Sequence, residues 1–232
     1  MAVRAVVERG PKGKRAAAFC LDWPGWSRGG KTPEAALDTL ESYRGRYRPI
    51  AAIAGLAAEF DAAGPLDVVE DRVGTGSTDF WGISFAPASA EADPMDEQER
   101  EKAIALLEAC WAFFDDVVSR VSPEMRLGPR GGGRDRDRIV RHTLRTESED
   151  FAKRLGLRVP EGAALTPEGL REHRRTYLAA MRAYDAGESR RRMRTWTLAY
   201  AIRHSAFHTL DHAWEMEDKD LSGDQAHPDT SG

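Results

Sequence analysis

Histidines near the C-terminal end of the chain are the residues whose types and spacing could support chemistry. Three of the six, His204, His208 and His212, recur every four residues. On a helix, residues four apart have Cβ atoms about 5–6 Å apart, so His208 and His212 can present two imidazoles to one divalent ion. His204 and His212 are separated by about 12 Å along the axis, so all three cannot bind the same ion. The spacing therefore predicts a two-histidine half-site with His204 beside it.

The apolar residues of this segment bear on two interpretations of the histidines. Leu198, Ile202 and Met216 fall on or beside the same helical face, so the pair is expected to point into the protein. The histidines could form a buried polar seam, or they could share a metal ion. Buried imidazoles without a shared ligand leave donors and acceptors to satisfy on each ring, so we favour the metal. Zn and Ni are the ions best suited to imidazole ligands.

A third ligand has to come from another helix, and the sequence offers two candidates. His142 lies roughly opposite the apolar stripe of its own segment if that segment is one unbroken α-helix. His173 lies on a continuous inward seam, so periodicity alone favours His173. Thr209 follows His208 where a zincin protease has its general-base glutamate, so that hydrolytic machinery is absent. His227 is expected to be incidental.

Strand patterns are confined to the first part of the chain, and helical patterns follow. The expected strands are 2–8 and 16–21, which would form a hairpin, then 66–70 and 79–85, with helices from Pro33 to about Tyr47 and after Pro49. Residues 86–96 have the Pro, Ala, Ser and acid content of a linker. Beyond it we expect four helices at about 97–122, 134–156, 166–186 and 194–219.

These patterns predict an α+β protein with two domains. A small α/β domain is expected over residues 1–90 and an antiparallel four-helix bundle over residues 91–221. Residues 222–232 have little apolar content, so we expect a disordered tail.

Charge, hydropathy and cysteine usage exclude several classes of protein. The formal net charge is −4, with 41% hydrophobic and 31% charged residues, which is typical of a globular chain. We expect neither a membrane span nor a signal peptide, because no apolar run is long enough for a membrane helix and the start of the chain lacks an apolar h-region. Cys20 and Cys110 lie far apart in apolar contexts, which predicts free thiols in a cytoplasmic protein. The excess of arginine over lysine indicates a bacterial source.

The helical part resembles the DinB-like superfamily of four-helix bundles. The resemblance rests on Arg141-His142-Thr-Leu-Arg-Thr-Glu147 and on His208-Thr-Leu-Asp-His212-Ala-Trp-Glu215, and it covers about residues 97–219. Members typically carry one histidine on the second helix and an HxxxH pair on the fourth, and they bind a divalent metal with open coordination positions. The resemblance implies His142, His208 and His212 as ligands, and it ranks His142 above His173. His204, Asp211 and Glu215 are candidates for orienting the imidazoles.

The start of the chain resembles the HicB-like fold of bacterial antitoxins. The resemblance rests on Phe19-Cys-Leu-Asp-Trp-Pro-Gly-Trp-Ser-Arg-Gly-Gly-Lys-Thr-Pro-Glu-Ala-Ala-Leu37, and it covers about 50 residues. Antitoxins of this type usually add a DNA-binding segment, whereas a helical bundle is expected here. Turn and capping chemistry explains Trp23, Pro24, Gly25 and Gly30 without an antitoxin role.

Two classes of function follow. The first is a metal-dependent enzyme that activates water or a low-molecular-weight thiol, of the S-transferase, isomerase or hydrolase type, acting on a small-molecule substrate. The second is a non-catalytic interaction protein, related to nucleic-acid binding or antitoxins through the HicB-like domain. Arginine clusters at 171–175 and 190–194 would serve the second class, but the net charge does not favour a nucleic acid. A homodimer is compatible with either class, and no membrane partner is expected.

Overall fold

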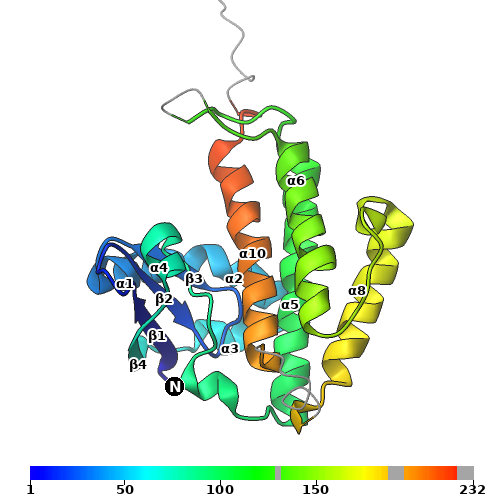
Figure 1. Ribbon diagram of the computed structural model, residues 1–232. Helices are drawn as coiled ribbons and strands as arrows, with labels where there is room; N and C mark the ends of the chain where they lie inside the picture. The colour runs from blue at the N-terminus through cyan, green and yellow to red at the C-terminus, as the bar shows by residue number, and fades with distance from the viewer. Residues whose placement is uncertain (129–131, 188–195, 224–232) are drawn as a thin grey trace, which may run out of the picture.

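A computed structural model describes residues 1–128, 132–187 and 196–223, and it has a mixed α+β fold (Figure 1). A small sheet with short helices lies on one side, and long helices run alongside one another on the other side. The expected tail from residue 224 onward, with His227, lies outside the described residues, as do the arginine cluster at 190–194 and the expected helix start at 194.

The sheet contains four strands in the order β3-β2-β1-β4. Strand β1 (Val3–Arg9) pairs antiparallel with β2 (Ala16–Cys20), so the predicted hairpin is confirmed. Strand β4 (Leu66–Val73) pairs parallel with β1, and β3 (Ser27–Gly30) pairs antiparallel with β2. The short strand β3 was not predicted, because the sequence Ser-Arg-Gly-Gly has no strand propensity of its own.

Short helices connect β3 to β4. Helix α1 (Pro33–Ser42) begins after Thr32, whose hydroxyl accepts a hydrogen bond from the Ala35 amide, and is followed by α2 (Arg44–Ile53) and α3 (Ala57–Asp61). The sequence predicted the break between the first two helices near Pro49. In the structure the break falls at Tyr43. Pro49 instead lies inside α2.

The expected strand at 79–85 is wrong. Helix α4 (Gly76–Trp81) occupies the first half of this segment. Asp79 accepts hydrogen bonds from the backbone amides of Lys12 and Lys14, each at 2.8 Å. These contacts fix the segment against the β1–β2 turn, so a distant loop overrides the strand propensity of the aromatic run.

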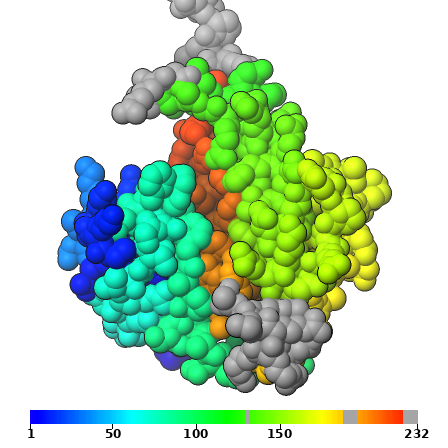
Figure 2. Space-filling view, in the orientation of Figure 1, coloured from blue at the N-terminus to red at the C-terminus, as the bar shows by residue number. Residues whose placement is uncertain are grey.

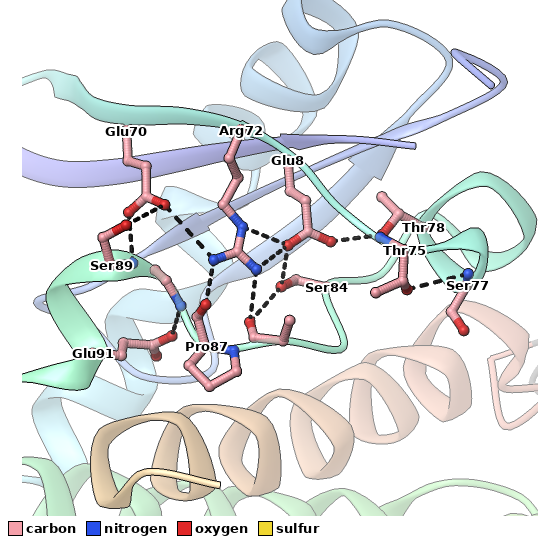
Figure 3. A network of polar contacts seen from close by, with 12 residues as sticks. Glu8, Glu70, Arg72, Thr75, Ser77, Thr78, Ser84, Pro87, Ser89 and Glu91 are labelled. Carbon is pink, nitrogen blue, oxygen red and sulfur yellow. Dashed lines mark hydrogen bonds and ion pairs between the residues drawn. The ribbon is translucent and has the colours of Figure 1, made fainter. Parts of the chain in front are cut away.

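A buried carboxylate secures the chain that follows β4 (Figure 3). Glu8 is fully buried, and it accepts hydrogen bonds from the hydroxyl groups of Thr78 and Ser84 at 2.6 and 2.9 Å. Arg72, which is opposite Glu8 in the strand register, donates to it from Nε at 2.9 Å. Arg72 also donates to the Pro87 carbonyl, so the strand pair holds the segment that leads to the 3-10 turn η1 (Ser89–Ala92).

In the described part of the chain, four long helical stretches, with short segments between them, follow at about the places that the sequence predicted. They are α5 (Glu97–Arg120), α6 (Arg136–Arg145), the π-helical segment η2 (Thr146–Phe151), α7 (Ala152–Arg154), the 3-10 turn η3 (Ala163–Leu165), α8 (Pro167–Arg182) and α10 (Leu198–Lys219). None of the helices in the described ranges is long and apolar enough to cross a membrane.

These long helices do not simply alternate in direction. Ion pairs join Arg174 to Asp115 and Arg182 to Glu101, so α8 runs antiparallel to α5. Helix α6 also runs antiparallel to α5, whereas α10 runs parallel to it (Figure 1). The expected antiparallel four-helix bundle is therefore found only in part. The connection between α7 and α8 runs back along the helices, so α6 and α8 point in the same direction (Figure 1).

One buried apolar cluster extends through both parts of the chain. It includes Trp26 and Tyr47 of the first part together with Leu107 of α5 and Trp214 of α10. In Figure 2, α10 is visible between the N-terminal part and the other helices. Cys20 and Cys110 are buried in this cluster as free thiols, and burial raises the pKa of both, so the prediction of unpaired cysteines is confirmed.

A buried ion pair gives the first stability prediction. Arg203 of α10 donates two hydrogen bonds to Glu91 at 2.6 and 2.9 Å, and both residues are only 3–4% exposed. Glu91→Ala leaves the guanidinium buried without its carboxylate, so we expect the free energy of unfolding to fall by about 3–5 kcal/mol. Urea unfolding measures this loss. Glu168→Ala, which removes an exposed pair with Arg171, is the control and should have little effect; equal losses would contradict the prediction.

Candidate metal centre

Three histidines from two helices converge at one place. His142 comes from α6, and His208 and His212 come from successive turns of α10. One ring nitrogen of each lies within 4.8 Å of the others, and the ring centroids are 4.7–5.2 Å apart. The structure thus brings together the three histidines that the DinB resemblance implies, although the periodicity of the sequence favoured His173 in place of His142.

The separation of two ring nitrogens suits a shared ion better than a direct hydrogen bond. Nε2 of His208 lies 3.4 Å from Nε2 of His142. An N–H···N hydrogen bond would be shorter, at about 3.0 Å. Two imidazole nitrogens that bind one tetrahedral zinc at about 2.0–2.1 Å are themselves about 3.3–3.4 Å apart. The observed distance therefore matches that of two ligands around one ion, and the three nitrogens of the full set lie within 4.8 Å of one another.

The π-helical segment η2 explains why periodicity misplaced His142. The stripe expected for this segment, which includes Val140 and Phe151, assumes one unbroken α-helix. Segment η2 lies between His142 and the end of that stripe, and a π turn adds a residue, so the helical phase after it differs from the phase before it. In α6 itself Ile139 and Thr143 are buried, and His142 lies beside this face toward α10.

His173 has a different partner. Its Nε2 lies 3.0 Å from Oε1 of Glu147, and Nε1 of Trp111 donates to the other oxygen of that carboxylate at 2.8 Å. His173 and Glu147 are almost fully buried. The alternative third ligand is thus engaged in a buried contact between α8 and η2 and is not a member of the three-histidine group.

Two of the imidazoles at the convergence point, His142 and His208, are held in the neutral form that binds metals. Burial, followed by the nearby His212, lowers the pKa of His142, and burial lowers the pKa of His208 well below its ordinary value. Metal ligation requires neutral imidazole. The low pKa values keep both rings neutral at neutral pH, so no proton has to be removed from them before a cation binds.

Glu215 orients the third ring. Its Oε2 lies 2.8 Å from Nδ1 of His212. Burial opposes ionisation of Glu215, but hydrogen bonds from His212 and Lys219 and the charge of Arg134 outweigh it and lower its pKa to about 2. An ionised carboxylate accepts a hydrogen bond, so Nδ1 carries the proton and Nε2 keeps its lone pair for a ligand bond.

The other residues expected near the ligands have structural contacts. Asp211 accepts a hydrogen bond from Arg28 of β3 at 2.7 Å, which links α10 to the sheet. Arg134 and Lys219, which donate to Glu215 at 2.8 and 2.7 Å, were not identified from the sequence. The i,i+4 spacing of Glu215 and Lys219 could have indicated one of these contacts, but Arg134 precedes α6 and only the tertiary structure brings it close.

His204 lies in an aromatic cage rather than beside a carboxylate. Its ring stacks on Tyr200 and contacts Phe151, Trp196 and Phe85. Its Nδ1 is buried without a hydrogen-bond partner within the described ranges. Burial, with a smaller contribution from Arg203, lowers its pKa to about 3. His204 is therefore a neutral core residue one turn before the candidate ligands.

Stability should depend on pH through His204. The unfolded residue titrates near 6.5 and the folded residue near 3, so between these values the unfolded state binds more protons and stability falls as pH falls. In His204→Phe this loss disappears, and we expect the decline in unfolding free energy between pH 6.5 and 5 to become shallower by about 1 kcal/mol per pH unit on average. Urea unfolding across this range tests the expectation. The two proteins should behave in parallel above pH 7.5, and parallel slopes below pH 6.5 would refute it.

Comparison of the chain with protein-family models, with curated proteins and with solved structures gave no match. The geometry of the three histidines and the surfaces around them therefore indicate the function.

Proposed function

We propose that this protein binds a divalent metal ion, zinc or nickel, through His142, His208 and His212, as the DinB-like resemblance implies. The observation that carries the proposal is the 3.4 Å separation of two facing Nε2 atoms, with the third imidazole beside them. A polar seam is the competing interpretation, and the 2.8 Å contact of His212 with Glu215 is compatible with either one. In a seam, Nε2 of His142 and Nε2 of His208 face each other at the long limit of a hydrogen bond, whereas a shared ion uses the lone pairs of both atoms.

We further propose that the bound ion serves an enzymatic reaction on a small molecule. A divalent ion held by three imidazoles keeps at least one open position, at which it can lower the pKa of water or a thiol or polarise a carbonyl group. The residues of the chain keep that position accessible. His142 is exposed and lines an open pocket of about 580 Å³, whereas His212 is buried and fixed by Glu215. A substrate would therefore approach from the α6 side.

The fold supports the same proposal. An HxxxH pair on the last long helix and one histidine on the second long helix is the arrangement expected of the DinB-like superfamily, and we propose that the helical part belongs to it. The hairpin followed by a capped helix at the start of the chain is what the HicB-like resemblance implies. That part packs on α10 through Arg28, which lies over the rings of Tyr43 and Trp214. We propose that it supports the metal site through α10.

Loss of a ligand should abolish stoichiometric metal binding. We expect His208→Ala and His212→Ala to bind no zinc at the wild-type stoichiometry, and His142→Ala to bind it much more weakly, because two nitrogens cannot hold the ion as three do. Titration calorimetry with zinc alone and elemental analysis after dialysis measure this.

The matched control is His173→Gln, which removes an imidazole from the Glu147 contact and should keep the zinc. Circular dichroism should show a native helical spectrum for all four variants. If His208→Ala and His212→Ala retain wild-type zinc, the histidines form a polar seam and the proposed function fails.

The carboxylate that orients His212 gives a graded prediction. Glu215→Gln removes the charge that fixes the tautomer of the ring but leaves all three nitrogens in place. We expect the zinc affinity to fall about 10–100-fold with the stoichiometry unchanged. Glu217→Gln is the control on the same helix, since Glu217 pairs with Arg46 and Arg120 rather than with a histidine. An equal effect of both substitutions on the zinc Kd would show that only net charge matters.

A further inference from the structure

The pocket beside His142 carries an unbalanced positive charge. Its wall includes four arginines, of which Arg134 precedes α6 and Arg138, Arg141 and Arg145 lie along it to its last residue. Residues three or four apart on a helix lie on neighbouring turns of one face, so His142 has Arg138 one turn before it and Arg145 one turn after it. The arginines and the exposed candidate ligand therefore share one concave surface.

Two of these arginines are already neutralised by carboxylates. Arg134 donates to Glu215, the carboxylate that orients His212. Arg145 binds Glu149 through two hydrogen bonds at 2.9 and 3.0 Å, and it also contacts Glu161. Their charges are therefore committed to holding the site and the connection before α8 in place.

The other two have no such partner. Arg138 and Arg141 are exposed, and neither guanidinium makes a hydrogen bond or ion pair with any residue that the structure describes. The acids of the pocket do not compensate for them, because Glu149 is bound to Arg145 and Asp150 lies 3.9 Å from Lys153. Two guanidinium groups in one pocket thus keep their full donor capacity for a ligand.

We propose that Arg138 and Arg141 bind the oxyanion group, a carboxylate or a phosphate, of the small-molecule substrate. Guanidinium groups bind carboxylate and phosphate oxygens through paired, charge-assisted hydrogen bonds. Because His142 belongs both to this pocket and to the three-histidine group, an anion held by the two arginines places the rest of its molecule beside the open side of that group. This inference rests on the proposed function for the reaction, but the anion site itself does not depend on a bound metal.

The first experiment tests the anion site alone. Metal-free protein is titrated with inorganic phosphate and, separately, with malonate in a calorimeter, at about 0.15 M NaCl to screen weak surface attraction. We expect saturable binding of at least one probe, and the stronger of the two identifies phosphate or carboxylate as the preferred group. The double variant Arg138→Gln/Arg141→Gln should weaken that binding about tenfold or more, because it removes both of the charge-assisted hydrogen-bond donors proposed to hold the anion.

The matched control is Arg175→Gln on α8, which removes one positive charge from an exposed pair with Glu172 outside the pocket. Its affinity for the probe should equal that of the wild type. Absence of saturable binding, wild-type affinity in the double variant, or an equal loss in the control would each overturn the proposal.

The second experiment tests the placement beside the histidines. With Co²⁺ in place of zinc, the paramagnetic ion should broaden the ³¹P signal of phosphate or the ¹H signal of malonate, and the double variant should abolish the broadening. Broadening that persists in the double variant would mean that the ion alone binds the anion, which overturns the role of the arginines. If Co²⁺ does not bind to the wild type, the proposed metal function fails, while the metal-free titration still decides the anion site.

Discussion

Helix α10 is buried along most of its length, so the charged and hydroxyl side chains that it carries inside the protein depend on nearby partners. Arg203 has Glu91 from the segment after the sheet, and Ser205 has the hydroxyl of Tyr177 at 2.8 Å. His212 finds its partner within the helix, in Glu215. The partners of Arg203 and Ser205 thus tie α10 to the segment after the sheet and to α8.

The burial of α10 also determines the surroundings of its histidines. His204 and His208 are one turn apart on the buried helix, and burial lowers the pKa of both rings. Aromatic rings surround His204 and keep it as a core residue. His208 instead faces His142 on α6, where the helix surface is open to solvent. The site thus lies at the boundary between a buried helix and an exposed one, which is where fixed ligands and an accessible coordination position can coexist.

The pairing of charged side chains also differs between the buried α10 and the exposed α6. On the buried side, carboxylates pair with individual cations, as Glu215 does with Lys219 and Arg134. On the exposed side, α6 presents Arg138 and Arg141 without acids to balance them, although the chain as a whole is acidic. A local excess of positive charge attracts anions to the site, and together with burial it disfavours the protonated form of His142 and His208.

The sequence by itself determined the local features: the hairpin, the long helices to within a few residues, the unpaired cysteines, and the four-residue spacing that places His208 and His212 on one face. These follow from short-range periodicity and capping, which any segment carries in its own residues. The family resemblance implied His142 and the periodicity favoured His173, and only the tertiary structure placed His142 beside the pair, because the π turn after it changes the helical phase in a way that no apolar pattern reveals. Likewise, segment 79–85 does not form the predicted strand, because Asp79 binds the backbone amides of Lys12 and Lys14, which lie far away in the sequence. Contacts between distant residues depend on the packing of whole elements, and that packing is not encoded in any one window of sequence.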